Sequence, residues 1–258
     1  MTEEIKVALS GGVLTVTISR ADKKNALTNE MYGALADAVA RADDDDEIRV
    51  LLIQADGDIF TAGNDVAEFA AQATGNGPKE HHVIRFLRGL ATATVPIVAA
   101  VQGKAVGVGT TMLLHCDYVL LSEDAQLITP FVNLALVPEA ASSLLLPLVT
   151  GHARAFEMFA LGEAVPASAA VAWGIANRTT SATELHAQAR RVAEKIAARP
   201  AGSLTAMKRL MRDAEKLVAQ MDRESVIFAE RLTSAEAKEA FTAFAQKRQP
   251  DFTRIGRQ

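Results

Sequence analysis

Two segments of the sequence place glycine where backbone N–H groups can take part in chemistry. Residues 60–65 read Phe-Thr-Ala-Gly-Asn-Asp, and residues 103–111 read Gly-Lys-Ala-Val-Gly-Val-Gly-Thr-Thr. Each segment follows a strand-like run and precedes a helix-like pattern, where free N–H groups and the helix dipole favour negative charge. Two such turns can direct N–H groups at one carbonyl oxygen and form an oxyanion hole. The alternative is that the glycines serve only close packing.

The second segment does not have the pattern of a phosphate-binding loop. Its Lys104 and Thr110 are not adjacent in the order Gly-Lys-Ser/Thr that ends such a loop, and its spacing is not G-x-G-x-x-G. The chain has one cysteine, Cys116, which excludes an intramolecular disulfide and any multi-thiolate metal site. We expect neither a metal nor a cofactor.

Other polar residues near these segments have simpler structural interpretations. His115 lies in an apolar run and is expected to be a hydrogen-bonded core histidine. Asp65 is expected to cap the helix after the first turn, and Asp117 to hydrogen-bond near the next strand. Glu68 and Glu157 are less favoured as catalytic acids because no motif ties them to the two turns.

Charge is distributed unevenly along the chain. The net charge is −4, but residues 1–185 hold 12 Lys/Arg against 22 Asp/Glu, whereas residues 186–258 hold 15 against 9. An acidic total argues against nucleic acid as the main partner, although the basic tail suits a smaller polyanion. The most apolar stretch, residues 95–121, contains Lys104 and Asp117 and is not expected to enter a membrane.

Strand-like and helix-like segments alternate through the first 140 residues, which is typical of an α/β fold. Strands are expected at residues 5–9, 13–19, 50–53, 96–101 and 118–121, and helices at 28–41 and 110–115. From residue 142 the pattern is mostly helical, with capping boxes expected at 181–184 and 233–236. We divide the chain at Pro200 into a core domain, 1–200, and a helical region, 201–258, whose apolar stripes need a partner surface.

The two glycine segments, preceded by Lys24-Asn25-Ala26-Leu27, make the sequence similar to the crotonase (enoyl-CoA hydratase/isomerase) superfamily over essentially the whole chain. The resemblance implies an α/β spiral of ββα turns with a C-terminal α-helical trimerisation region. It also implies acyl-coenzyme A thioester substrates and a homotrimer or dimer of trimers. The N-terminal residues lack the pattern of a secretory signal, so we expect a cytoplasmic protein.

The resemblance also assigns roles within the two turns. It gives the oxyanion hole to the N–H groups of Asn64 and Val108. Classical hydratases carry a pair of glutamates that position and activate water, whereas the matching positions here hold Thr111 and Phe131. Residues 129–144 instead resemble the Δ3,Δ2-enoyl-CoA isomerase branch, in which Glu139 is the single catalytic acid.

Glu139 follows an apolar stretch and precedes two alanines, so we expect desolvation to raise the pKa of its carboxyl group. One carboxylate near both carbons can remove a proton from C2 of an acyl thioester and return one to C4. The alternative is an exposed loop carboxylate, or one that caps the helix beginning near Ser142.

For coenzyme A, the resemblance points to the loop at residues 23–27, the turn after Gly63, and a C-terminal segment that reaches a neighbouring subunit. In that segment Lys247 would face phosphate and Phe244 the adenine, although a solvated helix end and a core aromatic are equally good interpretations. The expected substrate-binding residues are Lys24, Ala26, Leu27, Ala62, Asp65, Val66, Phe131, Phe244 and Lys247.

The leading hypothesis is a Δ3,Δ2-enoyl-CoA isomerase of fatty-acid β-oxidation type. One alternative is another acyl-CoA-processing member without the glutamate pair, such as a hydratase, hydrolase or lyase. A second is a non-catalytic member that binds acyl-CoA or RNA, of which RNA binding is disfavoured by the acidic total.

Overall fold

The computed structural model describes residues 2–65, 67, 68, 71, 77, 78, 80–253 and 255. Within these residues the larger of two sheets has six strands in the order β1-β2-β3-β4-β6-β9. β1 and β2 pair antiparallel and the other neighbours pair parallel. The strands are β1 (Ile5–Ser10), β2 (Val13–Ile18), β3 (Val50–Ala55), β4 (Ile97–Val101), β6 (Tyr118–Ser122) and β9 (Arg178–Thr180).

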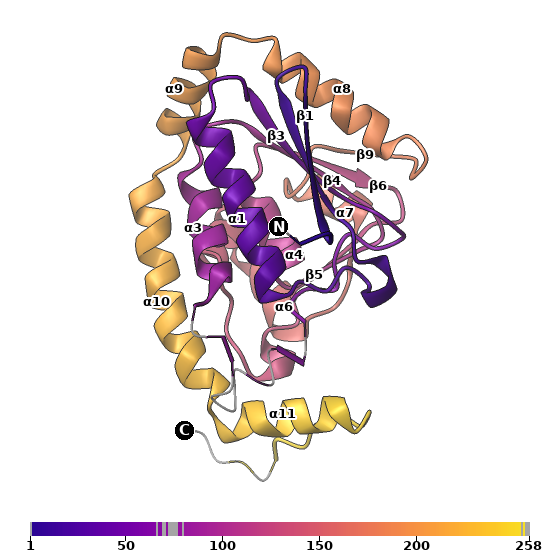
Figure 1. The fold of residues 1–258 in the computed structure, drawn as a ribbon. Coiled ribbons are helices and arrows are strands. Elements are labelled where there is room, and N and C mark those ends of the chain that lie inside the picture. The colour runs from indigo at the N-terminus through magenta and orange to yellow at the C-terminus, as the bar shows by residue number, and fades with distance from the viewer. Residues whose placement is uncertain are drawn as a thin grey trace.

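The central strands are buried on both faces, which explains their continuous apolar sequences. In β3, Leu51 and Ile53 join the main core beneath α1 (Asn29–Asp44) and α3 (His82–Thr92), whereas Val50 and Leu52 pack on the opposite face. That opposite face is covered by α8 (Leu185–Ala197). Figure 1 shows α1 and α3 side by side and α8 apart from them.

A smaller sheet carries the second glycine segment. It consists of β5 (Lys104–Val106), β7 (Gln126–Ile128) and β8 (Val165–Pro166), in the order β5-β7-β8. The chain leaves β5 through Gly107 and enters a short helix, α4 (Val108–Thr111). The remaining short elements are η1 (Ala21–Lys23), η2 (Met112–His115), η3 (Val132–Leu134), α5 (Ser142–Thr150), α6 (His152–Leu161) and α7 (Ala167–Ala172).

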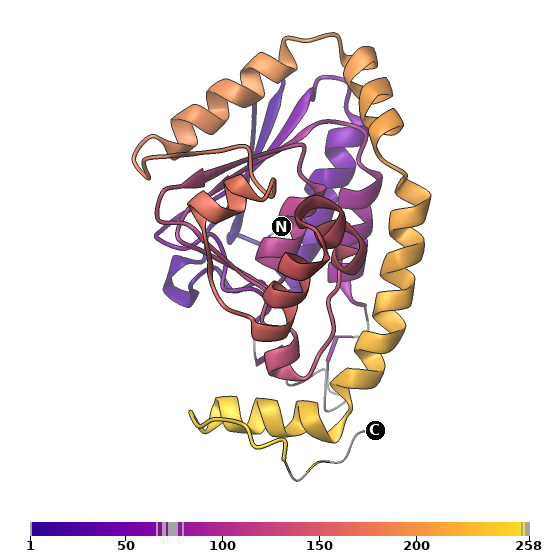
Figure 2. The same ribbon diagram turned by 180° about the vertical axis from the view of Figure 1, so that it is seen from behind.

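Three helices form the C-terminal region: α9 (Ala201–Met211), α10 (Ala214–Leu232) and α11 (Ala235–Ala245). Both ribbon views show α10 along the side of the molecule and α11 across its end (Figures 1 and 2). Lys208 of α9 binds Asp117 at 2.7 Å, and Arg88 of α3 pairs with Asp222 of α10. Among the described helices, none combines the length and apolar character that crossing a membrane requires.

The structure confirms the expected hairpin, the α/β core and the helix that begins after Thr28, whose hydroxyl accepts from the N–H of Met31 at 3.3 Å. The continuous helix expected at 110–115 is wrong, because the chain tightens after α4 into the 3₁₀ turn η2. The capping box at 181–184 is also wrong, since α8 begins only at Leu185 without a side-chain cap. At 233–236 the cap is shifted by one residue, to Ser234, which accepts from the N–H of Ala237.

Candidate active site

The two glycine turns lie against each other because their chains form a parallel bridge. Thr61 donates its N–H to Lys104 O at 3.1 Å, and Val106 donates to Thr61 O at 3.0 Å. A Cβ at Gly63 would lie 2.9 Å from Val106 O, and one at Gly109 would lie 2.4 Å from Thr61 Cγ2. Close packing is therefore one purpose of these glycines, and this packing is also what brings the two turns together.

Each turn presents one backbone N–H of the expected pair. Val108 is the first residue of α4, so its N–H has no acceptor within the helix. Asn64 forms a parallel bridge with Leu27, in which Leu27 donates to Gly63 O at 2.8 Å and Asp65 donates to Leu27 O at 2.9 Å. Because the residues flanking Asn64 make those bonds, its own N–H points away from Leu27.

Asn64 and Val108 line one cavity of about 430 Å³. Apolar side chains from η3, α10 and α11 form much of its wall, including Leu134, Phe228 and Phe241. The expected site residues that line it are Ala62, Asn64, Val108, Phe131 and Phe244. An apolar cavity with two backbone donors suits a molecule that carries a carbonyl oxygen on a hydrocarbon group.

Glu139 lies in the loop between η3 and α5, and its Oε1 accepts a hydrogen bond from Thr111 Oγ1 at 2.5 Å. Burial raises the pKa of Glu139 to about 7, an effect that the Thr111 hydroxyl opposes and the negative charge of Glu224 reinforces. The carboxylate is tied to Thr111, and Glu139 is not among the described residues that line the cavity. Thr111 connects it to the cavity wall, since the Thr111 hydroxyl also lies 3.5 Å from Val108 O.

Tyr32 connects the same acid to the other turn. Its hydroxyl donates to Asn64 Oδ1 at 2.5 Å. Burial raises the pKa of Tyr32 well above its ordinary value, and the charges of Glu139 and Glu68 raise it further. Glu139 therefore lies within electrostatic reach of both turns. The sequence analysis missed Tyr32, although a tyrosine on the buried face of a helix needs a partner for its hydroxyl.

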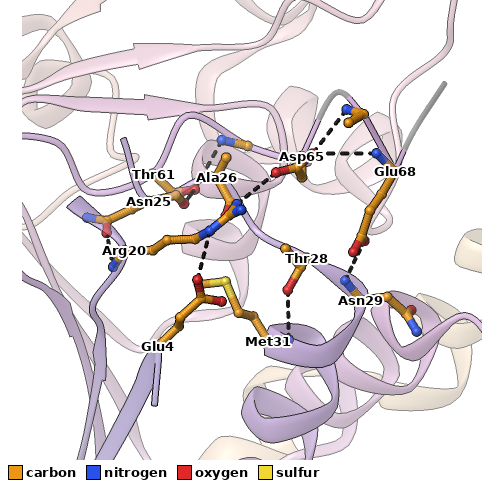
Figure 3. A network of polar contacts seen from close by, with 12 residues as sticks. Glu4, Arg20, Asn25, Ala26, Thr28, Asn29, Met31, Thr61, Asp65 and Glu68 are labelled. Carbon is orange, nitrogen blue, oxygen red and sulfur yellow. Dashed lines mark hydrogen bonds and ion pairs between the residues drawn. The ribbon is translucent and has the colours of Figure 1, made fainter. Parts of the chain in front are cut away.

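A polar network holds the loop at residues 23–27 against the first turn (Figure 3). Arg20 binds Asp65 at 2.7 Å and Ala26 O at 3.0 Å, and it pairs with Glu4 at 2.9 Å. Asn25 stabilises the loop as well, because its side-chain amide donates to Asp56 O and Ile59 O. The network explains why the loop keeps its shape.

Asp65 has the capping role that the sequence predicted. Its Oδ1 accepts from the N–H groups of Ala67 at 3.0 Å and Glu68 at 3.4 Å, and Arg20 holds its pKa below the ordinary value. Glu68 in turn accepts from the N–H of Asn29 at 2.6 Å, at the start of α1. Glu157 is exposed on α6.

The remaining expected coenzyme A residues lie in different places. Lys24 is exposed with a positive φ of 55°, and with Ala62 it lines a second cavity of about 450 Å³. Leu27 is buried, and its backbone N–H and C=O are both bonded to the first turn. Phe244 lines the main cavity of its own chain, and Lys247 is exposed just after α11. Val66 lies outside the described residues.

Comparison with known proteins identifies the family. A family model described as enoyl-CoA hydratase/isomerase matches residues 8–255. The chain belongs to the enoyl-CoA hydratase/isomerase family. A solved structure of a family member from Pseudoalteromonas atlantica T6c superimposes with a TM-score of 0.92 and 46% identity, covering 97% of this chain and 100% of that one. The crotonase fold and the C-terminal helical region are thereby confirmed.

Relatives in the family have different named activities. The 1,2-epoxyphenylacetyl-CoA isomerase of Escherichia coli (strain K12) is 32% identical over 260 aligned residues, covering 98% of this chain and 99% of that protein. Enoyl-CoA delta isomerase 2 of Rattus norvegicus is 31% identical over 250, covering 95% of this chain and 64% of the rat protein. Carnitinyl-CoA dehydratase of Proteus mirabilis (strain HI4320) is 31% identical over 262, covering 98% and 99%.

Membership in the family makes the chain an acyl-CoA-processing enzyme, with an acyl-CoA thioester as its substrate class. Within the described residues, no cluster of three or more His, Cys, Asp or Glu side chains is placed to hold a metal ion. The candidate site brings together two backbone donors, the Glu139 carboxyl group of raised pKa and an apolar cavity.

Proposed function

We propose that this enzyme is a Δ3,Δ2-enoyl-CoA isomerase that converts a 3-enoyl-CoA to a trans-2-enoyl-CoA. One observation carries the proposal. Thr111 occupies a position that matches a catalytic glutamate of classical hydratases. Its hydroxyl donates a hydrogen bond to the carboxylate of Glu139. Phe131, at the other such position, lines the cavity with an apolar ring. Neither of these two positions therefore supplies a carboxylate that could activate water.

The proposed reaction uses three groups of this chain. The thioester carbonyl oxygen accepts from the N–H groups of Asn64 and Val108. Glu139 removes a proton from C2, and the electron pair of that C–H bond delocalises into a dienolate whose oxygen the two donors stabilise. The resulting carboxylic acid gives a proton to C4 as the double bond forms between C2 and C3. No water is consumed, and neither a metal nor a redox cofactor takes part.

The raised pKa of Glu139, about 7, suits a group that must act first as base and then as acid. A carboxyl group with an ordinary pKa would be too acidic to match neutral pH, where the same group must both remove a proton from C2 and return one to C4. The hydrogen bond from Thr111 occupies Oε1, and we assign the proton transfer to Oε2.

Coenzyme A binding and assembly complete the proposal. The backbone of the loop at 23–27 and the turn at Ala62 bind the pantetheine and nucleotide. Lys247 and the exposed part of Phe244, which also lines the cavity of its own chain, contact the nucleotide of a neighbouring subunit. The assembly is a homotrimer or a dimer of trimers. It is supported by large apolar side chains exposed on the helices, among them Leu148, Phe156, Leu210 and Met211.

The proposal is tested on the purified enzyme with a 3-enoyl-CoA, following absorbance and product mass. Isomerisation gives a conjugated product of unchanged mass. A product heavier by one water would make the enzyme a hydratase, and release of free coenzyme A would make it a hydrolase. Either result as the main reaction would overturn the proposal.

A further inference from the structure

The turn that follows Glu139 has an unusual backbone. Ala140 and Ala141 both have positive φ angles, 61° and 54°, in the left-handed region that residues with a Cβ rarely adopt. Two such residues in succession persist only where their surroundings hold them in place. Glu139 directly precedes these two residues. The contacts that hold this turn therefore also set the direction of the Glu139 side chain.

Glu224 of α10 binds one side of the turn. Its carboxylate accepts from the N–H of Ala141 at 2.6 Å, from the N–H of Ser143 at 3.0 Å, and from the Ser143 hydroxyl. The side chain of Glu224 is 5% exposed, and Gln220 of the same helix donates to Ser143 Oγ at 2.9 Å. Only donors face the carboxylate in these contacts, and they lie at the first turn of α5, where the helix dipole favours negative charge.

His115 of η2 binds the other side. Its Nε2 lies 2.7 Å from Ala140 O, and its Nδ1 lies 3.1 Å from a guanidinium nitrogen of Arg212. Burial and the charge of Arg212 lower the pKa of His115 to about 3, so the ring is neutral. Since Arg212 can only donate, Nδ1 accepts and the Nε2–H donates to Ala140 O. Arg212 also donates to the carbonyls of Leu114 and His115.

We infer that Glu224 is a positioning residue: from the C-terminal helical region it holds the left-handed turn at Ala140–Ala141 and thereby directs Glu139 toward Thr111 and the oxyanion turns. The inference rests on the proposed role of Glu139. Glu224 does not touch the substrate in this account. It acts by fixing N–H groups on one side of the turn, while the neutral His115 fixes the carbonyl on the other.

The negative charge of Glu224 gives this role a second observable effect. The groups that act on Glu139 are Thr111 from α4, Tyr32 from α1 and Glu224 from α10, and of these Glu224 is the carboxyl group, whose charge raises the pKa of Glu139. Burial raises the pKa of Glu224 itself, and the hydrogen bonds from Ser143 and Ala141 oppose that rise. Removing that charge lowers the pKa of Glu139. A loosened fold that admitted water to Glu139 would lower the same pKa but would also raise KM, so KM distinguishes the two causes.

The test compares Glu224→Gln with Glu230→Gln, a control that removes a charge from an exposed position on the same helix. For Glu224→Gln we expect kcat at pH 8 to fall roughly tenfold or more with KM within about twofold, because a hydrogen-bonded buried carboxylate is lost. Where the Glu139–Thr111 bond stays intact, we also expect the acid limb of the kcat profile to move to lower pH. Glu230→Gln should match the wild type in both measurements. A kcat within about twofold of the wild type would overturn the role.

A crystal structure of Glu224→Gln separates this inference from the proposed function. We expect the turn to leave the left-handed region or Glu139 to lose its hydrogen bond to Thr111, whatever reaction the enzyme performs. An unchanged turn with an intact Glu139–Thr111 bond overturns the inference. If the wild type does not isomerise 3-enoyl-CoA, the proposed function fails while this arm still decides the role of Glu224.

A milder variant serves if Glu224→Gln does not fold. Ser143→Ala removes the hydroxyl donor to Glu224 and leaves the charge in place. We expect kcat to fall roughly three- to tenfold with KM unchanged, in line with the loss of one hydrogen bond to a charged group. A folded Ser143→Ala enzyme with wild-type kcat would contradict the positioning role.

Discussion

Glu139 owes its chemistry to two opposing influences on one carboxyl group. Burial and the charge of Glu224 disfavour the charged form, and the Thr111 hydroxyl favours it by donating a hydrogen bond. The balance leaves its pKa at about 7, where both protonation states are populated. The enzyme thus keeps a single acid in the range that proton shuttling requires.

Replacing Thr111 by valine tests this balance at the level of one hydroxyl. Thr111→Val removes the donor and keeps the shape, so the pKa of Glu139 rises and less of the base is ionised at low pH. We expect kcat/KM at pH 6 to fall roughly three- to tenfold and the rate at pH 9 to stay near wild type. Thr92→Val, at an exposed helix end, is the control. A pH profile identical to the wild type would contradict the role of Thr111.

The raised pKa of Glu139 also lowers the free energy of unfolding at neutral and alkaline pH. An unfolded glutamate ionises near pH 4.5, whereas folded Glu139 ionises near pH 7, so the folded chain holds more protons between these values and loses stability as pH rises through them. Glu139→Gln removes this cost. We expect the variant to be more stable than the wild type at pH 8, by on the order of 2 kcal/mol.

Denaturant unfolding at pH 8 and pH 4 measures that difference directly. At pH 4 the carboxyl group is protonated in both states, and the two proteins should have the same free energy of unfolding within error. A variant less stable than the wild type at pH 8 would show that the carboxylate of Glu139 is satisfied in the folded state rather than strained by burial.

At the scale of elements, the site depends on two strand-turn-helix units that meet at glycines. Gly63 has a φ of 88° and lies against Val106 O, so a side chain there strains the backbone and separates the two turns. For Gly63→Ala we expect a loss of about 1–3 kcal/mol of stability and a fall in kcat of tenfold or more. Gly202→Ala is the matched control, because a Cβ there meets nothing within 4 Å in α9. Equal activity of the two variants would contradict the need for close approach.

The elements also show what sequence patterns can and cannot predict. The hairpin, the strand-turn-helix units and the α/β class followed from local periodicity and glycine placement, since these depend on neighbouring residues. The Glu139–Thr111 bond spans 28 residues and the Tyr32–Asn64 bond spans 32, and no local period encodes such pairs. The capping box expected at Ser181 is wrong for a local reason: the backbone makes a turn at residues 181–184, and α8 begins only at Leu185.

At the scale of the whole molecule, the C-terminal helices do more than cover a surface. α10 supplies Glu224 to the turn beside Glu139, and Arg212, the residue after α9, binds His115. Cutting the chain at residue 200, where the sequence suggested a boundary, would leave that turn without Glu224 and without the partner of His115. The basic helical region is therefore joined to the candidate site within one chain.

The exposed apolar side chains of this region lead to a prediction about assembly. Leu210 is 90% exposed and Met211 is 79% exposed, which is unfavourable for a chain alone in water. We expect light scattering to give three or six times the chain mass of 27.5 kDa. Leu210→Glu should shift the mass toward smaller species, while Ala40→Glu on the exposed face of α1 should not. A monomeric wild type would contradict the proposed assembly.

The central claim is that one carboxylate carries the proton between two carbons of an enoyl-CoA. Its most direct test is the rate of 3-enoyl-CoA isomerisation by Glu139→Gln, which keeps the side-chain volume and removes the transferable proton. The control is Glu157→Gln, the same substitution at an exposed position on α6. The account predicts that kcat falls by about 10²- to 10⁴-fold in Glu139→Gln and stays within about twofold in the control. A folded Glu139→Gln enzyme that isomerises at the wild-type rate would contradict it.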